Sequence, residues 1–363
     1  MTKGPARLPC AILGAGGYVG QHFSQRLADH PWFDLPLLIG GTTSRGRRLE
    51  EMWHLAEPPP PALARTKLVG RGAAALARDG VRVVFSALPS GTAGPIEREL
   101  ARRGVAVFSN AADHRMDPDV PLLVPEVNPA HLELLARRPR GSAPLVTNAN
   151  CSATGLVVAL APLVRLLRPS VVHVTTFQAL SGAGLPGVAS LAIADNVVPY
   201  IAGEEEKLAL ETTRILGRVV PGGVRPAPFA VVAQCARVPV RDGHLEAVTL
   251  VARARPDRRA INEAWTAFDP LSPLQLPTAP RPPIHVRPEP DRPQPWRDRW
   301  AGAPERARGM AVSVGRLRWE PPFLRFFLLS HNAVRGGAGG SVLNAELAHR
   351  RGLLDGSGGA PGR

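Results

Sequence analysis

The first 150 residues alternate short apolar runs with amphipathic segments. The apolar runs predict buried strands at residues 9–13, 35–39, 81–87 and 105–109. The amphipathic segments predict helices at residues 21–29 and 93–102. Strands that alternate with helices are typical of a parallel sheet covered by helices. The pattern therefore predicts an α/β first domain of the Rossmann type.

The pattern changes after residue 150. An apolar segment at residues 153–167 predicts a helix, and longer strand-like runs follow it. These runs predict strands at residues 171–177, 229–240, 246–251, 311–317 and 324–329. They favour a mixed or antiparallel sheet in an α+β second domain. Residues 270–308 are rich in Pro, Arg and Asp and are expected to be mostly irregular, and a last helix is expected at residues 341–349.

A glycine-rich loop follows the first predicted strand directly. Glycine permits a tight turn and lets the backbone approach a pyrophosphate, which binds at the N-terminus of the next helix. The order of strand, glycine loop and helix therefore predicts a dinucleotide site. Its candidate residues are Gly14, Gly16, Gly17, Tyr18, Val19 and Gly20.

The loop after the second predicted strand indicates which dinucleotide binds. An acidic residue there would accept hydrogen bonds from the ribose 2′-hydroxyl group of NAD. Residues 40–48 contain no acidic residue and carry hydroxyl groups and arginines, which suit a 2′-phosphate. We therefore expect NADP as the cofactor, with contacts from Thr43, Ser44, Arg45 and Arg47.

The chain is strongly basic, but the distribution of its charge argues against nucleic acid as a partner. The formal net charge of +14 comes from arginines scattered along all 363 residues, without a basic tail. Only three of the 44 basic residues are lysines, which is more typical of a coding bias than of a binding surface. Lys207, which follows three glutamates, is a candidate for a site that needs a compact ammonium group.

Hydropathy and cysteine usage narrow the class further. The longest apolar stretch, residues 156–164, is too short to span a bilayer, and no secretory leader pattern is present, so we expect a cytoplasmic protein without a membrane partner. Three unevenly spaced cysteines give neither a disulfide framework nor a metal-ligand pattern, and we expect no metal. Cys10 and Cys235 lie inside apolar runs and are interpreted as small core residues.

Cys151 stands where a loop enters a predicted helix. The unpaired N–H groups and positive dipole end of that helix lower the pKa of a thiol placed there. This placement alone leaves a nucleophilic and a buried structural role equally open. His244 follows an Asp-Gly turn, and Arg237, seven residues earlier, suits a carboxylate ligand. Glu204 begins an amphipathic segment, where it also suits the ordinary role of stabilising a helix dipole.

Together these residues resemble the aspartate-β-semialdehyde dehydrogenases, specifically their archaeal and fungal-type branch. The resemblance extends from residue 13 to about residue 347 and includes Asp242-Gly243-His244. The other matching segments are residues 83–90, 109–111, 114–122, 125–128, 181–184, 203–207, 237–240, 291–295, 331–332 and 343–347. So many ordered matches identify the chain as a member of this family.

The resemblance implies an NADPH-dependent reduction of L-aspartyl-4-phosphate to L-aspartate-4-semialdehyde and inorganic phosphate, in the biosynthesis of lysine, threonine and methionine. It implies that Cys151 forms a thioester with the substrate and that His244 acts as acid and base. The remaining implied roles are phosphate and oxyanion binding by Asn150, substrate orientation by Gln178, phosphate binding by Arg115 and Lys207, α-carboxylate binding by Arg237, and ammonium binding by Glu204.

The resemblance also implies a cofactor channel and a domain organisation. Further residues expected to line the NADP channel are Ser86, Ser90, Ser181, Gly182 and Gly184, with Asn332 or Asn344 closing it. We expect an NADP-binding domain at residues 1–150 and a catalytic and dimerisation domain at residues 151–331, with the active site between them. A helix at about residues 332–354 would pack back on the first domain. The assembly would be a homodimer or a homotetramer.

The chain departs from the family pattern in four loops. Ala149 replaces a proline before Asn150, Gly16 replaces a threonine, Thr43 replaces an arginine, and residues 336–340 are richer in glycine. These departures leave open a paralogous acyl-phosphate or acyl-CoA reductase, acting on malonyl-CoA or on a substrate of secondary metabolism. Glu204 favours an unblocked α-amino acid, because malonyl-CoA has no ammonium group for this carboxylate.

Overall fold

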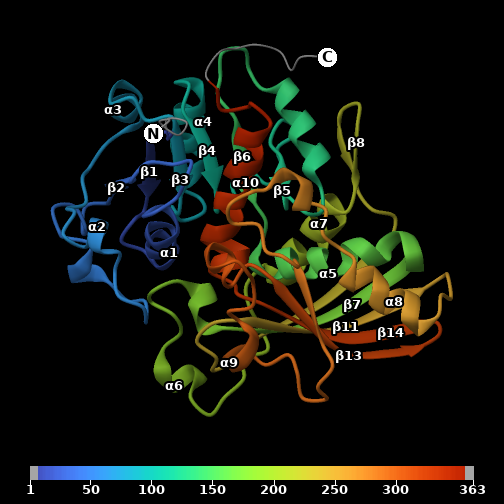
Figure 1. The fold of residues 1–363 in the computed structure, drawn as a ribbon. Helices are drawn as coiled ribbons and strands as arrows, with labels where there is room; N and C mark the ends of the chain where they lie inside the picture. The colour runs from blue at the N-terminus through green and yellow to red at the C-terminus, as the bar shows by residue number, and fades with distance from the viewer. Residues whose placement is uncertain (1–6, 356–363) are drawn as a thin grey trace. The chain divides into compact units, whose positions relative to one another are not determined.

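The computed structural model describes residues 7–355 of the chain. These residues form two compact units, which contain the elements labelled in Figure 1. In its described part, unit 1 consists of residues 7–123, 130–148 and 338–355. Unit 2 consists of residues 124–129 and 149–337. Within residues 7–355, no helix is both long enough and apolar enough to cross a membrane.

Unit 1 is built on a parallel sheet of six strands in the order β2-β1-β3-β4-β6-β5. The strands are β1 (Cys10–Leu13), β2 (Leu37–Ile39), β3 (Val83–Ser86), β4 (Ala106–Ser109), β5 (Leu122–Leu123) and β6 (Leu145–Asn148). The helices are α1 (Tyr18–Leu27), η1 (Glu50–Met52), α2 (Pro61–Ala64), α3 (Ala73–Arg78), α4 (Ala93–Arg102), η2 (Pro129–Arg137) and α10 (Gly339–Arg350). This arrangement confirms the predicted Rossmann-type sheet.

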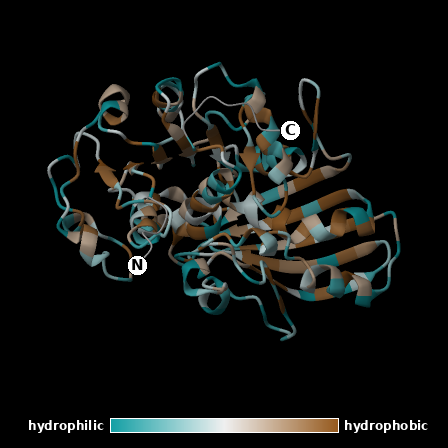
Figure 2. Ribbon diagram, turned by 45° about the horizontal axis from the view of Figure 1, so that its top comes forward, coloured by the Kyte–Doolittle hydropathy of each residue, from teal (hydrophilic) through white to brown (hydrophobic). Residues whose placement is uncertain are grey.

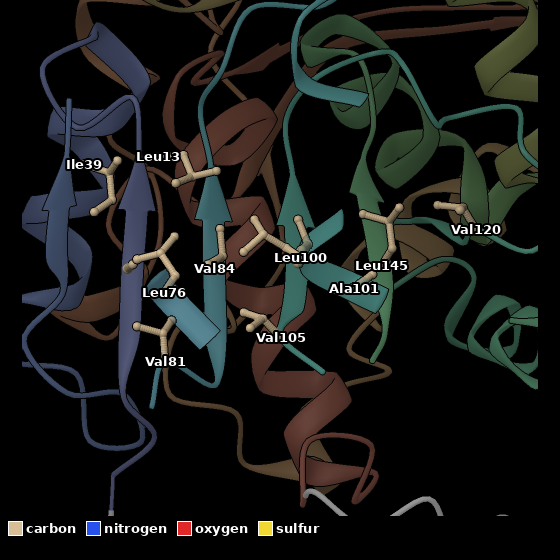
Figure 3. Close-up of a cluster of buried hydrophobic side chains, with 12 residues drawn as sticks. Leu13, Ile39, Leu76, Val81, Val84, Leu100, Ala101, Val105, Val120 and Leu145 are labelled. Atoms are coloured by element: carbon tan, nitrogen blue, oxygen red, sulfur yellow. The ribbon is translucent and has the colours of Figure 1, made fainter. Parts of the chain in front are cut away.

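A buried apolar cluster joins the sheet of unit 1 to two of its helices. Figure 3 shows Leu76 of α3 and Leu100 of α4 beside Val84 and Leu145 of the strands. Burying apolar surface of this kind stabilises the folded state by roughly 25 cal/mol for each Å² removed from water. The cluster therefore fixes α3 and α4 on the sheet, and with them the loops at the carboxyl ends of the strands, where dinucleotides bind in such folds.

Unit 2 is built on a mixed sheet of six strands in the order β10-β7-β11-β14-β13-β12. The strands are β7 (Pro169–Gln178), β10 (Ala230–Arg237), β11 (His244–Ala252), β12 (Ile284–Arg287), β13 (Val312–Glu320) and β14 (Phe323–Ser330), with a separate hairpin of β8 (Arg218–Val220) and β9 (Gly223–Arg225). The helices are α5 (Cys151–Leu167), η3 (Leu180–Ala183), α6 (Ser190–Ile193), α7 (Glu204–Ile215), α8 (Arg258–Thr266), η4 (Ser272–Leu274), α9 (Pro295–Asp298), η5 (Glu305–Ala307) and η6 (Val334–Ala338). The mixed sheet of the second domain is thus confirmed.

Helices cover one face of the sheet in unit 2. Helix α5 packs on β7, β11, β13 and β14, and α7 packs on β10. Along β11, buried residues alternate with half-buried ones from His244 to Ala252. His244 and Glu246 therefore lie on the face that the helices cover. Figure 2 shows that hydrophobic residues dominate the strands of this sheet.

The structure corrects several expected boundaries. Helix α1 begins at Tyr18 rather than at residue 21, so the last three residues of the expected glycine loop form its first turn. Helix α5 begins at Cys151 rather than at residue 153, because the side chain of Asn150 caps it. Strand β12 lies inside the segment 270–308, where prolines on both sides hide a strand of only four residues. The hairpin of β8 and β9 has no counterpart in the sequence expectations.

Candidate active site

Cys151 is the first residue of α5, and Asn150 fixes the start of that helix. The Asn150 Oδ1 atom accepts hydrogen bonds from the backbone N–H groups of Ser152 and Ala153, at 2.9 and 3.1 Å. Such an N-cap satisfies orphan donors of the first turn. Cys151 is half-buried, and its Sγ atom lies 3.1 Å from Nε2 of His244. The thiol is therefore at the positive end of a helix of 17 residues, where the thiolate is stabilised.

The hydrogen bonds of His244 define which ring nitrogen carries its proton. The backbone N–H of Ala179 donates to Nδ1 at 3.0 Å, so Nδ1 is an acceptor. In the neutral ring the proton then resides on Nε2, which faces Cys151. Burial, together with the positive charge of Arg237, lowers the pKa of His244 to about 3. The ring is therefore neutral at pH 7 and donates from Nε2 toward the sulfur.

The backbone of Ala179 also holds Arg237. Its carbonyl oxygen accepts a hydrogen bond from Nη1 of Arg237 at 2.8 Å. Arg237 is 7% exposed, and burial lowers the pKa of its guanidinium group. The carbonyl group of Ala179 is neutral and does not balance the positive charge of this buried guanidinium group. Arg237 therefore favours an anionic ligand.

Gly182 leaves the room in which Arg237 and His244 approach each other. A Cβ atom at this position would lie 2.7 Å from Nη1 of Arg237 and 3.3 Å from Cε1 of His244. No side chain fits there without displacing one of the two. Sequence reasoning assigned Gly182 to the cofactor channel, whereas its immediate neighbours are these two side chains.

Glu204, the first residue of α7, is held by two amide groups. Its Oε1 atom accepts from Nδ2 of Asn150 at 2.8 Å and from Nε2 of Gln178 at 3.0 Å. The Gln178 nitrogen also donates to Oγ1 of Thr176 at 3.2 Å. Asn150 and Gln178 therefore orient Glu204, and both use amide groups that were expected to contact the substrate.

The strand register brings these residues together. Arg237 of β10 is paired with Gln178 of β7, and Phe177 is paired with Leu245 of β11. His244 therefore lies beside Gln178 one residue further along. Separate elements of unit 2 thus place Arg237, Gln178 and His244 in one row at the end of the sheet.

Lys207 lies one turn after Glu204 on α7 and is exposed. Its Nζ atom lies 3.9 Å from the Cβ position of Gly203, so the side chain folds back toward the start of the helix. Within the described part of the chain, Lys207 forms no ion pair. Arg115, its expected partner in phosphate binding, belongs to unit 1, where Nη2 donates to the carbonyl oxygen of Asn110 at 2.8 Å.

In unit 1 the glycine loop has the geometry of a phosphate site. Gly14 has φ +73°, and a Cβ atom at Gly20 would lie 2.2 Å from the carbonyl oxygen of Gly14. Both positions therefore require glycine. Helix α1 begins after Gly17 with no side-chain cap and no acidic residue in its first turn. These N–H groups suit an anion.

The loop after β2 exposes its arginines. Thr43, Arg45 and Arg47 are exposed and Ser44 is half-buried. Arg45 packs on Gly70, and Nη2 of Arg47 donates to the carbonyl oxygen of Glu51 at 3.1 Å. The side chains thus stand on one short loop beside the carboxyl end of β2, where an adenosine ribose would lie.

The remaining expected cofactor residues have varied surroundings. Ser86 ends β3 and is fully buried, and Oγ of Ser90 accepts a hydrogen bond from the backbone N–H of Ala112. Asn332 donates to Oγ of Ser181 and accepts from the N–H of Gly243, so it fixes the turn before His244. Gly184 has φ +78° after η3.

Asn344 on α10 is a buried amide with unmet hydrogen-bonding capacity. It is 1% exposed, and within residues 7–355 neither its Oδ1 nor its Nδ2 atom has a hydrogen-bond partner. Buried amides are nearly always paired, so this group is suited to a ligand.

Comparison with known proteins places these features in a family. Residues 9–135 match the semialdehyde dehydrogenase NAD binding domain, and residues 160–335 match the semialdehyde dehydrogenase dimerisation domain. Aspartate-semialdehyde dehydrogenase from Archaeoglobus fulgidus is 45% identical over 349 residues, which cover 94% of this chain and 98% of that protein. The chain belongs to the aspartate-semialdehyde dehydrogenase family.

Two further members of this set of relatives bear on the chemistry. The solved structure of aspartate-semialdehyde dehydrogenase with NADP from Candida albicans has a TM-score of 0.83 and 35% identity, covering 96% of this chain and all of that one. Malonyl CoA reductase (NADP) from Metallosphaera sedula is 39% identical over 96% of this chain and 98% of that protein. The archaeal and fungal resemblance found in the sequence is thereby confirmed.

Sequence reasoning missed several residues that shape the site. Glu211 of α7 accepts a hydrogen bond from the backbone N–H of Asn150 at 2.6 Å. Glu246 lies two residues after His244 on the same face of β11. Glu246 could have been placed on the same face as His244, because side chains two residues apart in a strand point to the same side. The role of Ala179 has no such signal, because it acts through its backbone N–H and carbonyl groups.

Proposed function

We propose that this protein catalyses the NADPH-dependent reduction of L-aspartyl-4-phosphate to L-aspartate-4-semialdehyde and phosphate. The observation that carries the proposal is the 3.1 Å contact between Sγ of Cys151 and Nε2 of His244, beside Arg237 and Glu204. A nucleophile, a proton donor, a cation and an anion, brought together by the starts of two helices and the end of the sheet, match a substrate that carries a carboxylate, an ammonium group and an activated acyl group.

The first half of the reaction is an acyl transfer to sulfur. The Cys151 thiolate attacks the carbonyl carbon, a C–S bond forms, and the C–O bond to phosphate breaks with its electron pair on the phosphate. The start of α5 stabilises the thiolate. Because Nδ1 of His244 is already an acceptor, the thiol proton is released to solvent, to which Cys151 is partly exposed.

His244 acts in the second half. Bound NADPH would supply the hydride that reduces the thioester. The Nε2–H group of His244 faces the sulfur and donates to it as the C–S bond breaks, so it stabilises the departing thiolate. The ring is neutral throughout the physiological range, which keeps a proton on Nε2 for this purpose.

The substrate groups have matching partners. Arg237 suits the α-carboxylate, and Glu204 suits the ammonium group, with Asn150 and Gln178 fixing the carboxylate of Glu204. We assign the phosphate to Lys207 and Arg115. Lys207 supports this assignment because, among the described residues, its ammonium group forms no ion pair.

The residues present fit NADP. The uncapped start of α1 suits the pyrophosphate, and the exposed Arg45 and Arg47 suit the 2′-phosphate. The unpaired amide of Asn344 suits a carboxamide such as that of the nicotinamide ring. The NADP in the Candida albicans relative supports this choice.

Malonyl-CoA reduction would use the same cysteine chemistry. Two amide groups hold the carboxylate of Glu204 in place. Malonyl-CoA has no ammonium group, so it would leave this carboxylate without a cationic ligand. The site therefore favours the amino acid substrate, and malonyl-CoA serves as the competing substrate in the assay.

We further assign the NADP-binding domain to residues 1–150, the catalytic domain to residues 151–331, and the C-terminal helix to the first domain. The match of residues 160–335 to a dimerisation domain supports a homo-oligomer, and we propose a homodimer. On the half-buried face of the sheet in unit 2, β11 carries Leu245, Ala247, Thr249 and Val251, a mostly apolar row that suits the interface of a dimer. The mass measured by light scattering distinguishes a dimer from a tetramer.

A cytoplasmic location fits the free Cys151 thiol, which a reducing compartment preserves.

The decisive experiment is the reverse assay, in which semialdehyde, phosphate and NADP yield NADPH absorbance. The expected result is turnover that requires phosphate, with Cys151→Ala inactive and Cys10→Ala active as the matched control. Turnover with malonyl-CoA and NADPH but none with semialdehyde would contradict the proposal. Activity that survives Cys151→Ala would contradict the thioester.

A further inference from the structure

The backbone at Gly336 packs directly on the nucleophile. A Cβ atom at position 336 would lie 2.6 Å from both Cα and Cβ of Cys151, and 3.0 Å from its carbonyl oxygen. Real Cβ atoms do not approach backbone so closely, so only glycine permits this contact. The path of residues 334–337 therefore limits where Cys151 can lie.

The residue before Gly336 is fixed by a buried ion pair. Nη1 and Nη2 of Arg335 donate to Oε1 and Oε2 of Glu126 at 2.8 and 2.7 Å, and each side chain is 1% exposed. This two-bond geometry is specific to the planar guanidinium group, and a lysine cannot reproduce it.

The ion pair joins segments where the chain passes between the two units. Glu126 lies in residues 124–129, which belong to unit 2 although the chain on both sides belongs to unit 1. Arg335 comes two residues before the passage at 337/338, and Cys151 comes two residues after the passage at 148/149. Three connecting segments are thus gathered around the nucleophile on the unit 2 side.

Stability alone is a weak reason for such a pair. Well-packed apolar residues often stabilise a protein as well as a buried ion pair does, because desolvation opposes the attraction. A buried pair does define one geometry, since breaking it leaves an uncompensated charge. The geometry that this pair defines is the approach of Gly336 to Cys151.

We infer that Glu126 and Arg335 are positioning residues for the nucleophile: their ion pair holds Gly336 against Cys151 and so sets Sγ opposite Nε2 of His244. The inference rests on the proposed thioester chemistry, but it concerns the thiol itself. Neither residue is assigned to the substrate, and both act through the backbone of residues 335–336.

The test compares Arg335→Lys and Glu126→Gln with a matched control in the full-length protein. Arg292→Lys is the control, because Arg292 of unit 2 makes a similar two-bond pair with the buried Asp298 but is not tied to Cys151. The readouts are the rate of iodoacetamide alkylation of Cys151 from pH 5 to 9, kcat and KM in the reverse assay, and the melting temperature. Cys10 and Cys235 do not interfere, because burial raises the pKa of both thiols.

We expect Arg335→Lys and Glu126→Gln to lower the alkylation rate of Cys151 and kcat by about 10- to 100-fold, with KM nearly unchanged. Arg292→Lys should lose stability to a similar extent while keeping the alkylation rate and its pH profile. Folded Arg335→Lys protein with the alkylation profile and kcat of the unchanged protein would overturn the inference. Alkylation needs no substrate, so this result is independent of whether the proposed substrate is correct.

Discussion

The backbone N–H of Ala179 donates a hydrogen bond to Nδ1 of His244, and the carbonyl oxygen of the same residue accepts one from Arg237. The backbone of one residue, through two successive peptide groups, thus defines the tautomer of the histidine and the position of the arginine. It also excludes a standing ion pair between Cys151 and a protonated His244, because protonation would place two N–H groups face to face at Nδ1.

The alkylation of Cys151 should therefore show one titration only. Because the pKa of His244 is lowered to about 3, the rate from pH 5 to 9 should follow the thiol alone, without an inflection near pH 6.5. His244→Ala should slow the alkylation of Cys151 near neutral pH, since a hydrogen-bond donor to the thiolate is lost. Mass spectrometry of the labelled peptide measures both. A second inflection that disappears in His244→Ala would contradict the tautomer.

Glu246 should make the stability of the protein fall with rising pH. Its side chain is fully buried, and within residues 7–355 neither carboxyl oxygen has a hydrogen-bond partner. Burial and the nearby Glu204 raise the pKa of Glu246 well above its ordinary value. The folded state therefore retains a proton that the unfolded chain releases above about pH 4.3, and stability decreases as pH rises from there.

Glu246→Met should remove this loss. The variant should be more stable than the unchanged protein at pH 8.5, by roughly 1 to 3 kcal/mol, with a smaller difference at pH 5. Melting temperatures at the two pH values measure it, and Glu133→Met, at an exposed position, is the control. A lower melting temperature for Glu246→Met at pH 8.5 would show that the carboxylate is needed in its charged form.

Gly20→Ala should weaken NADPH binding. The added Cβ would lie 2.2 Å from the carbonyl oxygen of Gly14 and 2.7 Å from Cα of Ala15, so the phosphate loop must shift. We expect the Kd for NADPH to rise at least about tenfold, which corresponds to the loss of one charge-assisted hydrogen bond to the phosphate. Gly72→Ala, where no neighbouring atom lies within 4 Å, should bind normally. Calorimetric titration with NADPH compares them, and equal affinities would contradict the assignment of the loop.

Arg45→Ser and Arg47→Ser should weaken the use of NADPH but not that of NADH. Each change removes a cation from the expected 2′-phosphate site and should raise KM for NADPH by about 10- to 100-fold. KM for NADH should change little, because NADH lacks that phosphate. Arg102→Ala, at a position with an exposed side chain on α4, is the control. Equal losses with both cofactors would place the arginines outside the 2′-phosphate site.

The order of strands and helices was predictable because apolar runs mark buried strands and amphipathic segments mark helices that cover a sheet. Helix α4 and most strands of the two sheets follow these patterns closely. Strand β12 was not predictable, because Pro283 and Pro288 flank it and its four residues show no clear apolar pattern. The start of α5 at Cys151 depends on capping by Asn150, a polar signal that hydropathy does not register.

Within the site, the sequence identified the charged and nucleophilic side chains but not the groups that hold them. Cys151, His244, Arg237 and Glu204 were candidates from their positions in the sequence and received their roles from the resemblance. The structure brings all four together in unit 2. The backbone hydrogen bonds of Ala179 and the packing of Gly336 depend on the folded path of the chain. No residue type signals such contacts in advance.

The three thiols differ in burial, and this difference has a consequence for oxidative damage. Burial and the neighbouring glutamates raise the pKa of Cys235 to about 11, so at neutral pH it is almost entirely the unreactive thiol. Cys151 alone among the three cysteines then oxidises readily, and it has no second thiolate in unit 2 to convert a sulfenic acid into a disulfide. Recovery from peroxide therefore depends on small thiols supplied by the cell, and prolonged exposure would drive Cys151 to irreversible sulfinic acid.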